Sequence, residues 1–330
     1  MSTLVRVVAA ATFTCSIALA ACSSSGTGTT GTGGGTGTTS GTGGAGTGGG
    51  DAALVARGKY LTDNVIYCGQ CHTPTDAGGK PDLTRYLAGS KNYIFKYQGM
   101  DVTVIAENIT EDSEQGIGTW TDDMIRGAIQ AGLDDQKATM WAIMPYPEYA
   151  VMEGSDVSAI IAYLRTVMPN ANVVPPDSLE DPGSPAAPIN GSKVPHTTLD
   201  KSDPSYASAE RGRYLATIAC LSCHTEETDP GVPDMSKAFA GGRTFQAVGG
   251  KPATSTNITP DATGIAGWTA SDLATSIKTN TEKGTNRVLC DAMPGGPDHM
   301  GAMTDADLTD IGNYLSTIPP IQNGPFMCGM

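Results

Sequence analysis

The sequence predicts an all-α protein of two tandem domains, each built from a few helices. The first reason is an internal repeat: short motifs in residues 57–164 recur in the same order in residues 211–315. The second is periodicity, because apolar residues in both copies recur three and four positions apart, without sustained strand-like alternation. The third is composition: with only five Phe in 330 residues, domains of this kind need an added apolar group to fill their cores.

The repeat can be followed motif by motif. Each copy carries, in order, the patterns RGxYL, CxxCHT, PD, NIT, GIxxW, MP and YL. They occur at 57–61 and 211–215, 68–73 and 220–225, 81–82 and 233–234, 108–110 and 257–259, 116–120 and 264–268, 144–145 and 293–294, and 163–164 and 314–315. The nearly constant separation indicates a tandem duplication with small insertions.

Helices are predicted at matching places in the two copies. The first copy predicts them at 51–65, 121–130 and 155–167, and the second at 208–219, 270–279 and 304–317. The helix at 121–130 begins with Thr121, Asp122 and Asp123, a residue order typical of a capped helix start. The helix at 155–167 has to end before Pro169.

The predicted domains are 51–168 and 206–330, the second with a C-terminal tail. Between them, residues 169–205 are rich in proline and show neither a helical nor a strand period. Proline makes such a connector stiffer than a glycine-rich one. It either lies across both domains and sets their distance, or acts as a loose spacer, and the sequence leaves both open.

The N-terminus has the features of an export signal. In residues 1–21, Arg6 precedes an apolar run that is too short for an ordinary membrane span and stops at Cys22. This pattern resembles a bacterial lipoprotein signal, so Cys22 is predicted to carry lipid; ordinary cleavage after Ala21 is the alternative. Residues 22–50, nearly all Gly, Thr and Ser, are predicted to be a flexible tether.

Export places the protein in an oxidising compartment. We expect a membrane-anchored lipoprotein on the periplasmic side or in the outer membrane, since Ser23 after Cys22 resembles outer-membrane sorting. The chain carries 34 Asp and Glu against 20 Lys and Arg, a net charge of −14. This charge argues against nucleic acid, whose phosphates attract basic proteins, and favours protein partners with basic docking patches.

The repeated CxxCH motif has three possible chemistries: a zinc half-site, a thiol redox pair, or covalent haem attachment. A thiol pair of the thioredoxin kind requires a βαβ context, which the sequence lacks. Zinc requires four Cys or His ligands together, which two distant pairs could supply only by meeting in space. The chain has four histidines, and two of them directly follow the two CxxC pairs. That coincidence is the signature of c-type haem attachment.

Haem attachment assigns a role to each residue of the motif. Cys68 and Cys71, and likewise Cys220 and Cys223, would form thioethers with one porphyrin each. His72 and His224 would then bind the two irons. Methionines are the candidates for the sixth ligand, and only Met144 and Met293 hold equivalent positions in the copies, each before a proline. Core filling is the alternative role for a methionine.

Both copies resemble class I c-type cytochrome domains. More closely, they are similar to the haem domains in cytochrome c subunits of periplasmic alcohol and gluconate dehydrogenases. The resemblance rests on CGQCHT, NITEDSEQGIGTW and AIMPYPEY in the first copy and on CLSCHT, NITPDATGIAGW and AMPGGP in the second. It implies two covalently bound haem c groups. It also implies that the carbonyls of Pro81 and Pro233 accept a hydrogen bond from the ligating histidines, and that the Trp120 and Trp268 indoles reach haem propionates. Simple packing is the alternative role of the two tryptophans.

Two cysteines remain after this assignment. Cys15 lies in the predicted signal, Cys22 takes lipid and four cysteines hold haem, which leaves Cys290 and Cys328. In an oxidising compartment these two are predicted to form a disulfide. The competing interpretation makes Cys290 an iron ligand, because it lies shortly before Met293.

Iron with His and Met on its two axial positions has no open site for a substrate. The sequence therefore predicts an electron carrier rather than an enzyme. It would take electrons from a periplasmic or membrane dehydrogenase and pass them to a respiratory oxidase or another acceptor. The alternative is a dihaem redox enzyme of the cytochrome c peroxidase or thiosulfate dehydrogenase type, in which one iron is open or unusually ligated.

Overall fold

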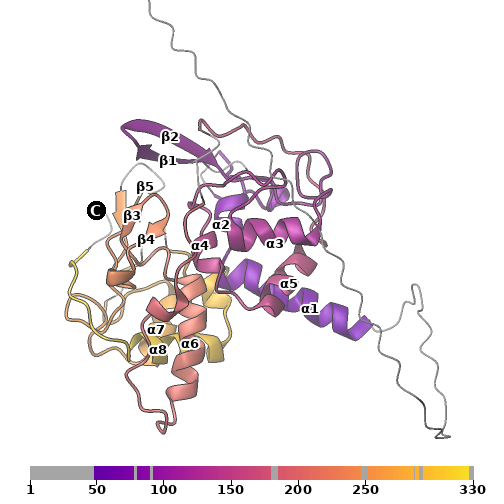
Figure 1. The fold of residues 1–330 in the computed structure, drawn as a ribbon. Helices are drawn as coiled ribbons and strands as arrows, with labels where there is room; N and C mark the ends of the chain where they lie inside the picture. The colour runs from indigo at the N-terminus through magenta and orange to yellow at the C-terminus, as the bar shows by residue number, and fades with distance from the viewer. Residues whose placement is uncertain are drawn as a thin grey trace, which may run out of the picture. The chain divides into compact units, whose positions relative to one another are not determined.

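A computed structural model describes residues 48–77, 80–89, 92–179, 185–246, 252–285, 287–289 and 293–326. Its regular elements are helices and short two-stranded sheets (Figure 1). The α-helices are α1 (Gly48–Tyr60), α2 (Gly69–His72), α3 (Asp122–Ala131), α4 (Tyr146–Tyr149), α5 (Gly154–Leu164), α6 (Tyr206–Ala219), α7 (Ala270–Thr279) and α8 (Asp305–Leu315). Short helical turns of other kinds are η1 (Leu61–Val65), η2 (Leu83–Arg85), η3 (Gly191–Lys193), η4 (Met235–Lys237) and η5 (Met300–Ala302).

All six predicted helices are present. Helices α1 and η1 together cover the first of them, and α3, α5, α6, α7 and α8 are the other five. Threonine caps the N-termini of α3 and α7. The Thr121 hydroxyl accepts a hydrogen bond from the backbone N–H of Met124, and the Thr269 hydroxyl accepts one from the backbone N–H of Asp272. Gly132 and Asn280 end α3 and α7 in the left-handed conformation.

The expectation of a purely α-helical protein is wrong in one respect, because the described residues also form three antiparallel strand pairs. Their strands are β1 (Asn92–Tyr97) with β2 (Met100–Ile105), β3 (Glu227–Asp229) with β4 (Val232–Pro233), and β5 (Thr244–Gln246) with β6 (Pro252–Thr254). In the first hairpin, Tyr97 pairs with Met100 across a two-residue turn. Gln98 and Gly99 both have positive φ there, as the tightest hairpin turns require.

The first and last helices of each copy cross at a glycine. Helix α1 packs on α5, and α6 packs on α8 (Figure 1). A Cβ on Gly58 would lie 1.8 Å from the carbonyl oxygen of Ala159, and one on Gly212 would lie 1.8 Å from that of Asp310. Both crossings therefore require a residue without a side chain, as the repeated RGxYL motif provides.

Replacing Gly58 with alanine is expected to lower the free energy of unfolding by about 1–3 kcal/mol, because the helices must separate to admit the methyl group. Urea unfolding of the haem-loaded protein measures this. The matched control is Gly127→Ala in α3, where a Cβ meets nothing within 4 Å. That change is expected to stabilise the helix by up to about 1 kcal/mol. Equal effects of the two substitutions would contradict the crossing argument.

Reciprocal hydrogen bonds join the two copies. The Tyr60 hydroxyl donates to Asp307 of α8 (2.6 Å), and the equivalent Tyr214 donates to Asp156 of α5 (2.8 Å). Each carboxylate is also paired with the arginine of its own copy, Asp156 with Arg57 and Asp307 with Arg211. Burial alone would raise the pKa of Asp307, but the hydrogen bonds from Tyr60 and Arg211 outweigh it, so the pKa is lowered. The duplicated motif thus builds a contact with the same chemistry on both sides.

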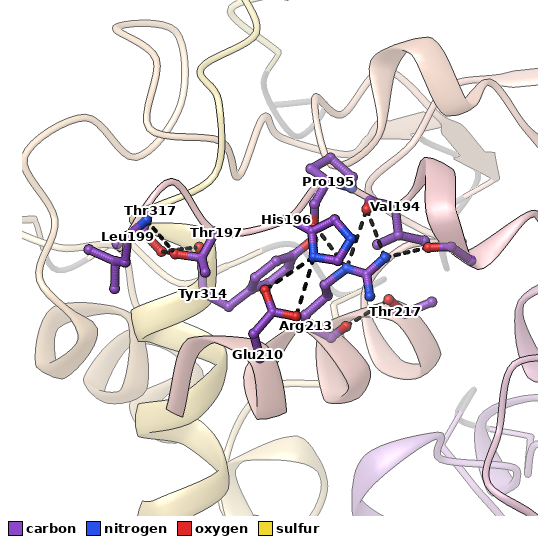
Figure 2. A network of polar contacts seen from close by, with 11 residues as sticks. Val194, Pro195, His196, Thr197, Leu199, Glu210, Arg213, Thr217, Tyr314 and Thr317 are labelled. Atoms are coloured by element: carbon purple, nitrogen blue, oxygen red, sulfur yellow. Dashed lines mark hydrogen bonds and ion pairs between the residues drawn. The ribbon is translucent and has the colours of Figure 1, made fainter. Parts of the chain in front are cut away.

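The connector packs on the second copy. Arg213 of α6 donates to the carbonyls of Gly191, Val194 and Pro195 (Figure 2). The Tyr314 hydroxyl donates to Pro195 as well (2.7 Å).

The connector also packs on the first copy. The indole of Trp141 donates to the carbonyl of Leu179 (2.7 Å), and the backbone of Ile189 donates to that of Pro147 (3.0 Å). The described part of the connector therefore lies against both copies and is not a loose spacer.

Residues 47–330 belong to one compact unit, and its hydrophobic core takes side chains from both copies, Ile160 and Ile311 among them. The predicted division at 168 and 206 stays a prediction. No helix in the described ranges combines the length and apolar character needed to cross a bilayer.

Candidate functional site

Each CxxCH motif forms a tight helical turn. In the first, the backbone N–H groups of Cys71 and His72 donate to the carbonyl of Cys68 (3.1 and 2.9 Å), and helix α2 covers this turn. In the second, His224 donates to Cys220 (2.9 Å). One helical turn brings the two cysteines and the histidine of a motif to neighbouring positions, which is the placement that a single porphyrin edge and its iron require.

The histidine rings are held by backbone carbonyls. Nδ1 of His72 lies 2.6 Å from the carbonyl oxygen of Glu107, and Nδ1 of His224 lies 2.8 Å from that of Thr256. Burial lowers the pKa of both histidines, against an opposing effect of these hydrogen bonds, and so favours the neutral ring. A neutral ring that donates from Nδ1 keeps its lone pair on Nε2, the form that binds a metal.

These acceptors differ from the predicted ones. Pro81 instead pairs with Thr75 in an isolated β-bridge, and Pro233 pairs with Glu227 between strands β3 and β4. Sequence reasoning missed Glu107 and Thr256 because any residue supplies a carbonyl. The available signal was the NIT motif, which follows each acceptor directly.

The NIT motif fixes these carbonyls in place. The buried Asn108 accepts from the backbone and hydroxyl of Thr110, and its amide donates to the carbonyl of Asn170 after α5 (2.7 Å). The buried Asn257 makes the same bonds with Thr259 and donates to Ile321 after α8 (2.8 Å). Each NIT segment therefore ties the histidine acceptor to the chain that follows the last helix of its copy.

The thiols do not have the chemistry of a redox pair. Burial raises the pKa of Cys68 and of Cys220 to about 12. Reactive thiols require a lowered pKa, because the thiolate is the nucleophile. Within the described ranges, no group of three or more His, Cys, Asp or Glu side chains is placed to hold a metal ion. The donor set of each turn, two thiols and an imidazole with Nε2 free, fits covalent haem.

Met144 and Met293 lie in loops with the same local turn. The backbone N–H of Tyr146 donates to the Met144 carbonyl (2.7 Å), and that of Gly295 donates to the Met293 carbonyl (2.8 Å). Both side chains are partly buried against the core. By contrast, Met152, Met300 and Met303 are almost fully buried and fill the core. Met144 and Met293 are therefore less buried than these three methionines, and their role as iron ligands stays a prediction.

Trp120 and Trp268 also hold equivalent places. Each directly precedes the capping threonine of its helix, α3 or α7, and is partly buried against the core. The predicted contact of their indoles with propionates stays a prediction.

Cys22, Cys290 and Cys328 lie outside the described residues, and so do the proposed lipid attachment and disulfide.

The two attachment turns lie near each other. Burial raises the pKa of Cys223, and the charges of Cys71 and Glu148 raise it further. The Tyr93 hydroxyl of β1 donates to the sulfur of Cys71 (2.8 Å). Burial raises the pKa of this phenol most, and the charges of Cys71 and Cys223 raise it further. These electrostatic effects indicate that Cys71 of the first motif lies within reach of Cys223 of the second.

The family comparison agrees with this geometry. The model of the family "Cytochrome c" matches residues 209–319, which contain the second attachment turn and Met293. Residues 209–319 are a cytochrome c domain. A domain of this family implies covalent haem c, whose iron exchanges one electron between its ferric and ferrous states.

Three relatives with c-type cytochrome names match 77–83% of the chain. A "Diheme cytochrome c-type" protein of Cereibacter sphaeroides is 28% identical over 267 residues, covering 77% of this chain and 83% of that protein. The "Alcohol dehydrogenase (quinone), cytochrome c subunit" of Gluconobacter oxydans is 31% identical over 296 residues, 83% of this chain but 56% of that subunit. The "Gluconate 2-dehydrogenase cytochrome c subunit" of Pantoea cypripedii is 28% identical over 284 residues, with 81% and 60% covered. The chain therefore spans little more than half of the dehydrogenase subunits.

Proposed function

We propose that the chain is a lipid-anchored dihaem cytochrome c that relays electrons from a periplasmic or membrane dehydrogenase to a respiratory acceptor. The observation that carries the proposal is the duplicated histidine arrangement, in which His72 and His224 each donate from Nδ1 to a backbone carbonyl. Each turn can hold one haem through its two cysteines, so the chain would carry two haem c groups.

The proposed axial methionines decide between carrier and enzyme. With Met144 and Met293 bound opposite the histidines, both irons would be saturated and limited to electron exchange. The names of the similar dehydrogenase subunits support a dehydrogenase as electron donor. The net charge of −14 supports donors and acceptors with basic docking patches. Lipid on Cys22 would hold the protein at the periplasmic side of a membrane or in the outer membrane.

The test is an optical spectrum of the purified, haem-loaded protein in both oxidation states, with a pyridine haemochrome count. We expect two haems per chain, both low-spin, with the far-red absorption band of methionine-ligated ferric iron. One haem per chain would contradict the dihaem proposal. A high-spin haem that reacts with peroxide or thiosulfate would instead assign the protein to the dihaem enzymes.

A further inference from the structure

Glu148 is a buried carboxyl for which the described part of the chain supplies no side-chain hydrogen-bond partner. It belongs to α4, in the turn that follows Met144, and its residue is only 1% exposed. Among the described residues, neither of its carboxylate oxygens has a hydrogen-bond partner. Buried polar groups are almost always hydrogen-bonded, so an exception calls for a functional explanation. The electron-relay proposal gives this carboxyl no role.

The charged groups that face Glu148 come from the second copy. Burial is the largest effect and raises the pKa of Glu148 to about 8, against smaller lowering effects of the residue's own backbone N–H and of Arg243. The charge of Glu227 raises the pKa further. Arg243 is already paired with Glu227 (2.7 Å) and donates to the carbonyl of Ser222 (2.7 Å). Helices α3 and α6 pack against α4. No charged side chain of these two helices shifts the pKa of Glu148. A carboxyl in this setting can change its protonation state near neutral pH.

Helix α4 places this carboxyl near the second attachment turn. The charge of Glu148 acts on Cys223 of the second turn. The phenols of Tyr146 and Tyr149, the titratable groups beside it on α4, both respond to its charge. Burial raises the pKa of Tyr149, and the charges of Cys68, Cys71 and Cys223 contribute. A charge at Glu148 and a charge at the haem of the second turn would therefore interact through a poorly solvated interior.

We propose that Glu148 is a proton-binding site that couples proton uptake to haem reduction, most strongly for the haem at Cys220 and Cys223. The proposal rests on the proposed attachment of haem at these turns. When an external donor gives one electron to the ferric iron, the site loses one positive charge, and the Glu148 carboxylate binds one proton from solvent to form the neutral acid. When an acceptor oxidises the iron, the electron would pass to that acceptor and the Glu148 carboxylic acid would release its proton to solvent.

The experiment is a spectroelectrochemical titration of the haem-loaded protein from about pH 6 to about pH 10. This range is centred near the pKa of Glu148, which is raised to about 8. We expect the midpoint potential of one haem to fall as the pH rises, because the carboxylate stabilises the ferric state. Glu148→Gln is expected to remove this dependence. The matched control, Glu114→Gln, replaces an exposed carboxyl of the same copy and is expected to titrate like the wild type.

A second readout keeps the proposal testable if the Glu148→Gln protein does not fold. The infrared difference spectrum of the wild type, reduced minus oxidised, is expected to contain the C=O stretch of a carboxylic acid formed on reduction. Its absence at about pH 8, or the same pH dependence of the potential in the wild type and the Glu148→Gln protein, would overturn the proposal. The haem count on the same samples reports separately on the proposed function.

Discussion

Replacing both Cys220 and Cys223 with alanine is expected to reduce the haem content from two groups per chain to one. Both thioethers of the second turn are lost by this change, so a porphyrin there would keep only its axial bonds to the iron and no covalent link to the chain. The first turn keeps Cys68 and Cys71 and should keep its haem. Pyridine haemochrome absorbance against protein concentration measures the ratio, and intact mass measures the covalent haem that remains.

The matched control lies inside the same turn. Ser222→Ala changes a residue between the two cysteines whose backbone carbonyl, rather than its hydroxyl, accepts from Arg243 (2.7 Å). This variant is expected to keep both haems. Two covalent haems in the double-cysteine variant would show that the second turn is not an attachment site, and would reopen the thiol and zinc alternatives.

The helices could be predicted from the sequence because their signals are local. Thr121 and Thr269 cap helices that begin where the sequence places them, and Pro169 lies shortly after the end of α5. The first hairpin was missed, although Tyr93, Phe95 and Tyr97 alternate before Gly99, because a run of six residues between polar segments carries a weak signal. Its strands gain stability from packing of Phe95 and Tyr97 on Trp141, which lies far away in the chain.

The site could be predicted only where a residue type is chemically specific. Cysteine, histidine and methionine side chains can bind haem or iron, so their positions in a repeated motif indicate the site from the sequence alone. The carbonyls of Glu107 and Thr256 carry no such mark, and only the folded chain shows them beside the histidines. Glu148, flanked by tyrosines and next to a proline, has the sequence context of a surface turn. Its environment depends on Arg243 and Glu227, which the second copy brings to it.

Substituting histidine for Met144 is expected to lower the midpoint potential of one haem and to remove part of the far-red absorption. Methionine opposite histidine raises the potential relative to a second imidazole, because a thioether donates less charge to ferric iron. Axial ligands set haem potentials over a range of roughly 0.8 V, and a shift on the order of 0.1 V or more is expected here. The iron should stay low-spin, since histidine also fills the sixth position.

Met293→His is expected to act in the same way on the other haem, and the double variant should shift both waves of a redox titration. The control is Met152→Leu, which replaces a methionine that is 5% exposed and packs in the core. That change should leave both potentials in place while altering the urea midpoint by a small amount, because the two side chains have similar volumes. If Met144→His leaves the potentials and the far-red band unchanged, Met144 is not a ligand. Met140 would then be the next candidate, because it lies in the same loop and is partly exposed rather than packed in the core.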